Sequence, residues 1–298
     1  MWFLPWIFIT TCLSPASLWP SMICLRHISH FYSRSGGQKI SALKDINFTI
    51  PLGSFTAIIG PNSSGKSTLC RIMAGLLAPA SGQVWLDDAE LSSWEQGNLR
   101  KTIGLVFSHP EDQIVLPTVE EDLAFGLENF HFDRNQIEKK VADMIESLGM
   151  QAYGRGFTHQ LSGGQKQKLA IASMLILGLR YLILDEPLSF LDTRARSETL
   201  AFIQGIHRQG TTIVYGAQFF EELTTANHII ALSEGKILWQ GSFPELLKNP
   251  DIVSMSGIKV PPIIRLAERL RTSGLLLADP IYTVEQFITA LRKVKNED

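Results

Sequence analysis

The sequence predicts an α/β domain built around a mostly parallel β-sheet. Helix-length segments separate the later apolar segments, which is the spacing that parallel strands need for their crossover connections. A chain of 298 residues is long enough for one such domain and a smaller second one. The segments expected to be strands are apolar and β-branched, as strands covered on both faces must be, and they occupy 55–60, 102–107, 181–185 and 211–216.

The composition is that of an ordinary globular protein. Hydrophobic residues make up 45% of the chain and charged residues 19%, and the net charge is -2. A nucleic-acid partner would usually require a basic domain or stripe, so none is expected. Cys12, Cys24 and Cys70 lack metal-ligand spacing and even pairing, which indicates a reducing compartment such as the cytoplasm.

Residues 1–21 form an apolar N-terminal extension. No Lys or Arg precedes its apolar stretch, and Pro5, Pro15 and Pro20 interrupt any helix long enough to cross a bilayer. Two interpretations remain open: the natural start of the protein is Met22, or the extension makes a weak contact with a membrane.

The rest of the chain is predicted to form two domains. The α/β pattern occupies 22–250, with a helical insertion at about 108–165 that contains the amphipathic segment NQIEKKVADMIESLG. Near the end of this domain, Ser242 is placed to cap a short helix. Residues 251–298 are expected to form a compact accessory domain that also serves in dimerisation.

Two amphipathic helices are predicted within that accessory domain. PPIIRLAERLRTSG is closed by Gly274, because glycine readily ends a helix. TVEQFITALRKV has Thr283 as its N-cap and Gln286 three residues later, which is the pattern of a capping box.

The segment GPNSSGKST has the form of a P-loop, a glycine-rich turn that leaves a strand and opens a helix. Its glycines let backbone N–H groups curl around phosphate oxygens, and the helix N-terminus adds partial positive charge. We expect Lys66 to reach the β- and γ-phosphates of ATP and the Ser67 hydroxyl to coordinate Mg²⁺. The predicted phosphate-binding residues are Gly60, Pro61, Asn62, Ser63, Ser64, Gly65, Lys66, Ser67 and Thr68.

The apolar strand YLILD is followed by a second acidic residue, so that it ends in Asp185 and Glu186. Charges at the end of a buried element are costly unless they have a role. Alone, this pattern fits a solvated strand end equally well. In a chain that also has a P-loop, we expect Asp185 to hold Mg²⁺, usually through water, and Glu186 to polarise the attacking water as general base.

LSGGQ lies between these two motifs, and this order of motifs resembles the ATP-binding-cassette family. Ser162, Gly163 and Gly164, followed by Gln165, form an anion-binding cap at a helix N-terminus. In that family the motif closes over the γ-phosphate held by a second subunit. The resemblance, which covers the α/β domain, implies a P-loop NTPase with a RecA-like core that binds ATP and Mg²⁺ and sandwiches two nucleotides in a dimer.

Other features of that family follow in order along the chain. Tyr32 lies where the family places an aromatic ring on adenine, although a lone Tyr near a first strand fits a surface or core position equally well. SFLD resembles the loop whose aspartate, here Asp192, bridges the two subunits. The turn at Glu234 and Gly235 corresponds to a family hairpin.

Two segments, 106–129 and the C-terminal stretch from VPPII to LRKV, look like the energy-coupling-factor importers and their cobalt and nickel relatives. In such transporters two ATPase subunits drive a transmembrane coupling protein, which tips a separate substrate-binding membrane protein. The resemblance implies a peripheral subunit at the cytoplasmic face of the membrane, with the coupling protein at Pro110–Gln113. A solvated acidic loop is the alternative for that segment. The transported substrate, a vitamin or a metal ion, is bound by another polypeptide.

Two positions depart from the family pattern. Ser108 stands where the family has the Gln that senses Mg²⁺ and the attacking water, and Ser is too short to span the same gap. Gln218 stands where the family has the His that holds the γ-phosphate. Gln donates an N–H but carries no positive charge. We therefore expect this chain's own site to bind nucleotide but to hydrolyse it more slowly. The alternative is that Gln218 and Ser108 work nearly as well as the residues that the family has at these positions.

Three classes of function follow from these motifs. The first is a transporter ATPase, which in this chain is the weaker partner of a heterodimer with a second ATPase. The second is a soluble ATPase of the same family that acts on ribosomes or DNA, which would be expected to carry two cassettes or a long coiled coil. The third is a regulatory nucleotide-binding subunit, which the substitutions at Ser108 and Gln218 keep open.

Overall fold

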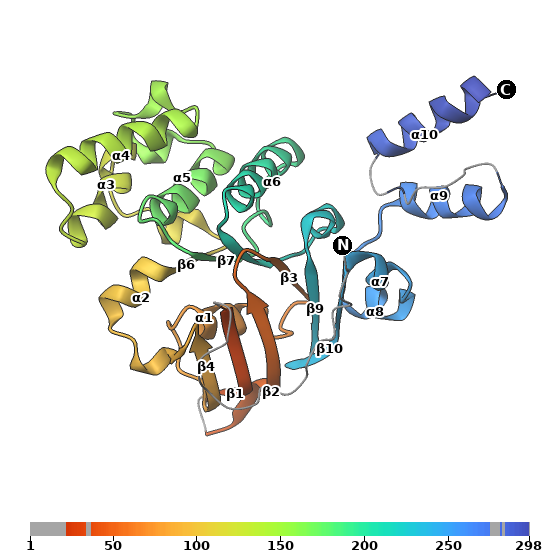
Figure 1. Cartoon of the computed structure of the whole chain (residues 1–298), viewed down its shortest axis with the longest axis horizontal. Coiled ribbons are helices and arrows are strands. Elements are labelled where there is room, and N and C mark those ends of the chain that lie inside the picture. The colour runs from red at the N-terminus through yellow and green to blue at the C-terminus, as the bar shows by residue number, and fades with distance from the viewer. Residues whose placement is uncertain (1–21, 34–36, 275–280, 282–283, 298) are drawn as a thin grey trace, which may run out of the picture.

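The computed structural model describes residues 22–33, 37–274, 281 and 284–297. The extension 1–21 and the predicted cap Thr283 lie outside the described residues. The described part of the chain has the α/β architecture that the sequence predicts, with one sheet of six strands and one of four. Figure 1 shows the smaller sheet below the larger one, with separate groups of helices to either side.

The larger sheet has the strand order β10-β9-β3-β8-β7-β6. The pairs β3–β9, β3–β8, β8–β7 and β7–β6 are all parallel, and β10 closes one edge in an antiparallel pair with β9. The four strands predicted from the sequence are β3, β8, β7 and β6, which lie next to one another in this sheet. The strands are β3 (Phe55–Ile59), β6 (Ile103–Val106), β7 (Tyr181–Asp185), β8 (Thr212–Gly216), β9 (His228–Ser233) and β10 (Lys236–Gly241).

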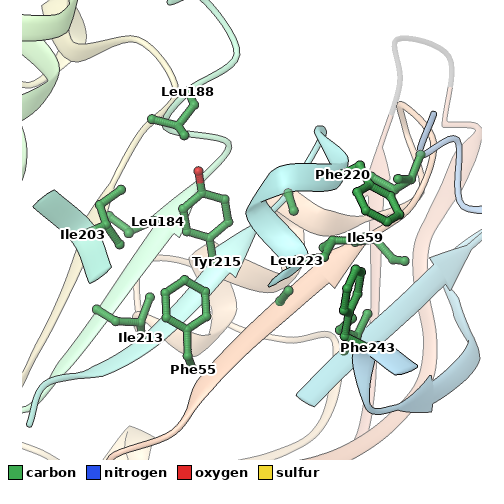
Figure 2. Packing of buried hydrophobic residues seen from close by; sticks show 14 of the residues in the cluster. Phe55, Ile59, Leu184, Leu188, Ile203, Ile213, Tyr215, Phe220, Leu223 and Phe243 are labelled. Atoms are coloured by element: carbon green, nitrogen blue, oxygen red, sulfur yellow. The ribbon is translucent and has the colours of Figure 1, made fainter. Parts of the chain in front are cut away.

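The central strands of this sheet are buried on both faces, which explains why β3, β6, β7 and β8 are mostly apolar. Side chains alternate between the faces: Phe55 and Tyr215 join one core, whereas Ile58 and Val214 join the other. Figure 2 shows the first core, where the rings of Phe55 and Tyr215 stack with centroids 5.8 Å apart. The helical elements of this first core include α5 (Gly163–Leu175), α6 (Thr193–Arg208) and the 3₁₀ segment η5 (Phe220–Thr225).

The opposite face packs against α1 (Lys66–Met73) and the smaller sheet, which is antiparallel and has the order β2-β1-β4-β5. The helix α2 (Gln96–Thr102) also contributes Leu99 to this second core. The strands are β1 (Met22–Ser33), β2 (Lys39–Pro51), β4 (Ser81–Leu86) and β5 (Ala89–Glu90), and the 3₁₀ segment η1 (Leu91–Ser93) follows them.

A separate core holds the helices that follow β6. It joins α3 (Val119–Asn129), α4 (Arg134–Ser147) and α5, which lie together at one end of the molecule (Figure 1). Thr118 and Glu121 form a capping box at the start of α3, which fixes where this helix begins. Three short 3₁₀ segments complete this region: η2 (Pro110–Asp112), η3 (Gln151–Tyr153) and η4 (Thr158–Gln160).

The C-terminal helices lie at the other end of the molecule (Figure 1). They are α7 (Phe243–Leu247), α8 (Pro250–Met255), α9 (Pro262–Thr272) and α10 (Val284–Glu297). Ser242 is the N-cap of α7, as predicted, and the two amphipathic helices are also confirmed. A small cluster that includes Ala267, Ile281 and Phe287 packs α9 and α10 together.

None of the helices in the described ranges combines the length and the apolar character that a membrane span needs.

The side chain of Asp87 connects the two sheets. Asp87 follows β4, and its carboxylate accepts hydrogen bonds from the hydroxyl of Tyr181 at 2.6 Å and from the backbone N–H of Met22 at 3.1 Å. It also pairs with Arg180 at 2.7 Å. Burial and the nearby Asp87 raise the pKa of Tyr181, so that its hydroxyl stays protonated and donates. One turn residue therefore fixes the antiparallel sheet against the start of β7.

We expect Asp87→Ala to lower the free energy of unfolding by about 2–4 kcal/mol, because it removes these hydrogen bonds and leaves Tyr181 unpaired. Ala is also strained at this position, where φ is 56°. Asp87→Asn should have a smaller effect, since Asn tolerates the left-handed region. Denaturant unfolding measures both values. Asp88→Ala, at the exposed neighbouring position, is the control and should change stability by less than about 0.5 kcal/mol. A change equally small in Asp87→Ala would contradict this role.

Candidate functional site

The predicted site residues meet at the carboxyl-terminal edge of the larger sheet. Because β3, β8, β7 and β6 are parallel neighbours, the segments that follow them leave the sheet at the same edge. The P-loop follows β3, Gln218 follows β8, Glu186 follows β7 and Ser108 follows β6. The topology thus gathers four segments that are far apart in the sequence.

The P-loop is shaped by glycine where it enters α1. Gly65 has φ of 109°, and a Cβ atom at this position would lie 2.7 Å from the carbonyl oxygen of Ala42. The hydroxyl of Ser64 is buried and has no hydrogen-bond partner among the described residues. A tight turn with an unpaired polar group at a helix N-terminus suits the binding of phosphate oxygens.

Lys66 is buried, with 4% of its side chain exposed, and its ammonium group is held within the site. It donates to the carbonyl oxygens of Gly60 at 2.6 Å and Pro61 at 3.3 Å. It also pairs with the carboxylate of Glu186 at 3.1 Å. A buried ammonium group needs such a counter-charge, and Glu186 supplies it.

Both carboxylate oxygens of Glu186 are engaged. Oε1 pairs with Lys66, and Oε2 accepts a hydrogen bond from the side-chain amide of Gln218 and a longer one, 3.4 Å, from the hydroxyl of Ser189. Glu186 also has φ of 51°, in the left-handed region that residues other than glycine rarely adopt. The structure therefore brings the predicted base, the P-loop lysine and the predicted γ-phosphate sensor into direct contact.

Ser67 and Asp185 form a neighbouring pair of oxygen donors. The Ser67 hydroxyl donates to Asp185 at 3.0 Å. Burial raises the pKa of the Asp185 carboxyl, and the hydrogen bond from Ser67 opposes that rise. Magnesium prefers oxygen ligands, so this pair fits the predicted role of holding the ion. Bound there with ATP, the ion would neutralise charge on the phosphates.

The LSGGQ segment is located at the N-terminus of α5. Ser162 is the N-cap: its backbone N–H donates to the side chain of Gln165 at 2.9 Å, and the Gln165 N–H donates to its hydroxyl at 3.4 Å. A Cβ atom at Gly164 would lie 2.8 Å from the Cβ of Ala195, whereas one at Gly163 would meet nothing closer than 3.6 Å. In the described structure no hydrogen bond joins this segment to the P-loop, so the two halves of the predicted ATP site are separate within one chain.

Ser108 is directed to its neighbour and not to the carboxylates. Its hydroxyl lies 3.2 Å from Nδ1 of His109, whose ring packs on that of Phe190 with centroids 4.1 Å apart. The second Gln of this region, Gln113, is held by the backbone at both ends of its amide, through Phe107 N–H at 2.8 Å and the Leu105 carbonyl at 2.9 Å. Both ends of the Gln113 amide are therefore used by the backbone of its own segment. Gln113 does not replace the long amide side chain that is missing at position 108.

Tyr32 lies beside the P-loop helix. Its hydroxyl is 3.2 Å from that of Thr68, and its side chain is 40% exposed. The ring is therefore tethered next to the predicted phosphate site while part of it remains accessible, as stacking on a base would require.

Sequence analysis did not predict two residues behind the site, Glu222 and Arg196. Glu222 is 2% exposed and binds the backbone of Gln218, and Arg196 packs on the ring of Phe219. The pair Glu221–Glu222 gives no signal in the sequence of which carboxylate is buried. In the sequence, an Arg in the first turn of a helix, such as Arg196, cannot be distinguished from an ordinary solvent-exposed residue.

Comparison with known proteins gives the family. Residues 43–189 match the family model described as ABC transporter. The energy-coupling factor transporter ATP-binding protein EcfA1 of Caldanaerobacter subterraneus is 35% identical over 269 residues, which cover 90% of this chain and 97% of that protein. Its namesake in Symbiobacterium thermophilum is 38% identical, with coverages of 84% and 88%. The chain belongs to the ATP-binding-cassette family of ATPases.

Solved structures agree with this assignment. The ABC ATPase described here is similar to cbiO1 from Clostridium perfringens, described as part of the ABC transporter complex cbiONQ, with a TM-score of 0.71, 30% identity and coverages of 86% and 98%. It is also similar to the dimeric cassette MJ0796 bound to ADP and Pi, with a TM-score of 0.67, 26% identity and coverages of 74% and 98%.

We expect Lys66→Ala to weaken the binding of ATP about tenfold to a hundredfold, because a charge-assisted hydrogen bond contributes about 1.5–3 kcal/mol. Isothermal titration calorimetry with MgATP measures the affinity, and thermal unfolding checks that the fold is retained. Lys236→Ala, at an exposed position of β10, is the matched control and should bind as the parent does. Equal affinity in Lys66→Ala and the parent would contradict the assigned role.

Proposed function

We propose that this chain is the ATP-binding subunit of an energy-coupling-factor importer, and that it couples ATP binding and hydrolysis to uptake of a vitamin or a metal ion. It acts as a peripheral subunit at the cytoplasmic face of the membrane. The observation that carries the proposal is the convergence of Lys66, Ser67, Asp185 and Glu186 at one sheet edge, in a chain whose relatives are named for that transporter.

The proposal places the membrane coupling protein around Pro110–Gln113 and in a groove of about 590 Å³ between α3 and α4, whose lining begins at Leu116. The floor of the groove is apolar, and its rim carries four glutamates. An amphipathic helix with basic residues along its edges fits such a surface. The groove is lined by Leu116, Pro117, Glu120, Glu121, Ala124, Glu128, Ile137, Glu138, Val141, Ala142 and Ile145.

An ion pair supports a link between this surface and the LSGGQ segment. Glu111 lies in η2, within the proposed docking segment, and pairs at 2.5 Å with Lys166, which directly follows Gln165 in α5. The Lys166 side chain is 18% exposed, whereas that of Glu111 is 72% exposed, so the pair lies at the edge of the solvent and orients the two segments more than it stabilises them. Movement of the docking segment is thereby carried to the residues that complete the partner's ATP site.

The chain's own site is proposed to be weakened. In a sandwich dimer, each site combines one subunit's P-loop with the other subunit's LSGGQ segment. The neutral side-chain amide of Gln218 donates a hydrogen bond to Glu186, and the Ser108 hydroxyl is hydrogen-bonded to His109. Neither residue can supply a positive charge to the γ-phosphate. We therefore propose a heterodimer in which Ser162–Gln165 completes the partner ATPase's more active site.

We expect Glu186→Gln in this chain to lower ATP turnover of the complex less than about twofold, whereas the same change in the partner lowers it more than about tenfold, as loss of a general base does. Single-turnover hydrolysis by the two complexes measures both effects. Equal losses would contradict the asymmetric model.

Gly163→Asp in this chain should abolish transport, because it places a carboxylate next to the partner's γ-phosphate. Gly163 has room for a Cβ atom, so Gly163→Ala is the matched control. Gly164→Asp is less informative, since its Cβ would clash with Ala195.

A regulatory nucleotide-binding subunit is the second candidate, and the contacts of Ser108 and Gln218 favour it. Turnover by the purified chain and by the complex with its partner ATPase separates the two. A complex whose turnover does not depend on this chain's LSGGQ segment would favour the regulatory role.

A further inference from the structure

We propose that Glu222 and Arg196 are positioning residues that fix the backbone of Gln218 and tie it to the SFLD loop. The proposal rests on the proposed function, in which Gln218 stands at the γ-phosphate sensor position of this chain's own, weakened site. In the described part of the chain, no hydrogen bond or ion pair joins either residue to the P-loop. Each acts through the segment 217–219, which connects β8 to η5.

Glu222 holds this segment from the core side. Its Oε2 accepts hydrogen bonds from the backbone N–H groups of Gln218 at 2.7 Å and Phe219 at 2.9 Å. Its Oε1 accepts a third from the hydroxyl of Tyr215 at 3.1 Å. Figure 2 shows that this hydroxyl points away from Phe55. A carboxylate this deeply buried is tolerated only because these donors replace water.

These bonds fix the backbone that carries the sensor. The N–H of Ala217 donates to the carbonyl of Ile58 in β3 at 2.9 Å. Together with the two N–H groups held by Glu222, three consecutive backbone donors are therefore bound. With the backbone fixed, the side chain of Gln218 reaches Glu186.

Arg196 connects the same segment to the SFLD loop. It lies in the first turn of α6, where the carboxylate of Asp192 caps the helix by accepting from Ala195 N–H at 2.8 Å. The Arg196 guanidinium donates to the carbonyl of Leu191 at 3.1 Å, and its central carbon lies 3.5 Å from the centroid of the Phe219 ring. A cation at this distance from an aromatic face is attracted to it. The SFLD loop, which the family resemblance places at the subunit interface, is thus joined to Phe219, the residue after Gln218.

The proposed role of Glu222 depends on its charge, so a pH-dependent measurement distinguishes it from a purely structural role. Burial raises the pKa of Glu222 to about 7, against the opposing effects of the two backbone N–H groups, Tyr215 and Arg196. The charged groups near this turn are Arg196, the exposed Glu221 and, beyond Tyr215 and Gln218, Glu186. Above this pKa the carboxylate is ionised and its hydrogen bonds are charge-assisted, and below it they weaken. Gln218 is therefore held less firmly as the pH falls below about 7.

The first experiment is hydrogen exchange on the full chain, which does not depend on any activity. In Glu222→Ala the amides of Gln218 and Phe219 should exchange at least about tenfold faster than in the parent, because they lose their acceptor. Glu222→Gln keeps an acceptor oxygen and should change exchange less. Exchange in β3 reports on global unfolding and should stay unchanged. The control is Glu221→Gln, at the exposed neighbouring position. Unchanged exchange at 218 and 219 in Glu222→Ala would overturn the proposal.

The second experiment measures hydrolysis at this chain's own site, in a complex whose partner ATPase carries the Glu-to-Gln change at its general base. Arg196→Ala and Glu222→Ala should lower kcat at least about fivefold with ATP affinity within twofold, since the P-loop is untouched. Arg194→Ala, in the exposed ion pair with Glu198, is the control for Arg196. In Glu222→Gln the decline of the parent's kcat below pH 7 should be lost.

The outcomes separate the two proposals. Faster exchange with unchanged kcat would show that Glu222 fixes the segment but that Gln218 is not a sensor, which overturns the proposed role of Gln218. An unchanged kcat in Arg196→Ala together with a lowered one in Glu222→Ala would overturn the tie to the SFLD loop. A pH profile of Glu222→Gln that matches the parent's would overturn the role of the charge.

Discussion

The ion pair between Lys66 and Glu186 depends on the parallel order of β3, β8 and β7, and most of the site depends on that pair. Burying an ammonium group with 4% of its side chain exposed is costly unless an anion lies nearby. Glu186 provides one because β7 ends at the same sheet edge as β3. Gln218 can then bind the second oxygen of that carboxylate because β8 lies between the two strands.

The segments that carry strong local patterns were predictable from the sequence. Strands buried on both faces hold few polar residues, so β3, β6, β7 and β8 were evident as largely apolar runs. The hairpin at Glu234–Gly235 and the cap at Ser242 were also predictable, since turns and helix starts are short-range features. The P-loop was located from its glycine-rich motif between a strand and a helix, and LSGGQ from its resemblance to the signature motif of the ATP-binding-cassette family.

The remaining features depend on contacts between residues far apart in the sequence. Asp87 meets Tyr181 only because two sheets pack together, and nothing near Asp87 in the sequence indicates that. Glu221 is exposed and Glu222 is buried, although the two have the same side chain. The contact between His109 and Phe190 likewise joins loops that follow different strands. Such pairings follow from topology, which single-residue patterns do not encode.

The close approach of α5 and α6 at Gly164 and Ala195 has a further consequence. A Cβ atom added to position 164 would lie 2.8 Å from that of Ala195, so the two positions share a space that holds one methyl group. Enlargement of either side chain requires the two helix starts to separate, and these helix starts carry Ser162 and Asp192. Positions 164 and 195 are therefore expected to covary during divergence of the family. A chimera that took α5 and α6 from different relatives would pack well only if its residues at these two positions were small enough to fit together.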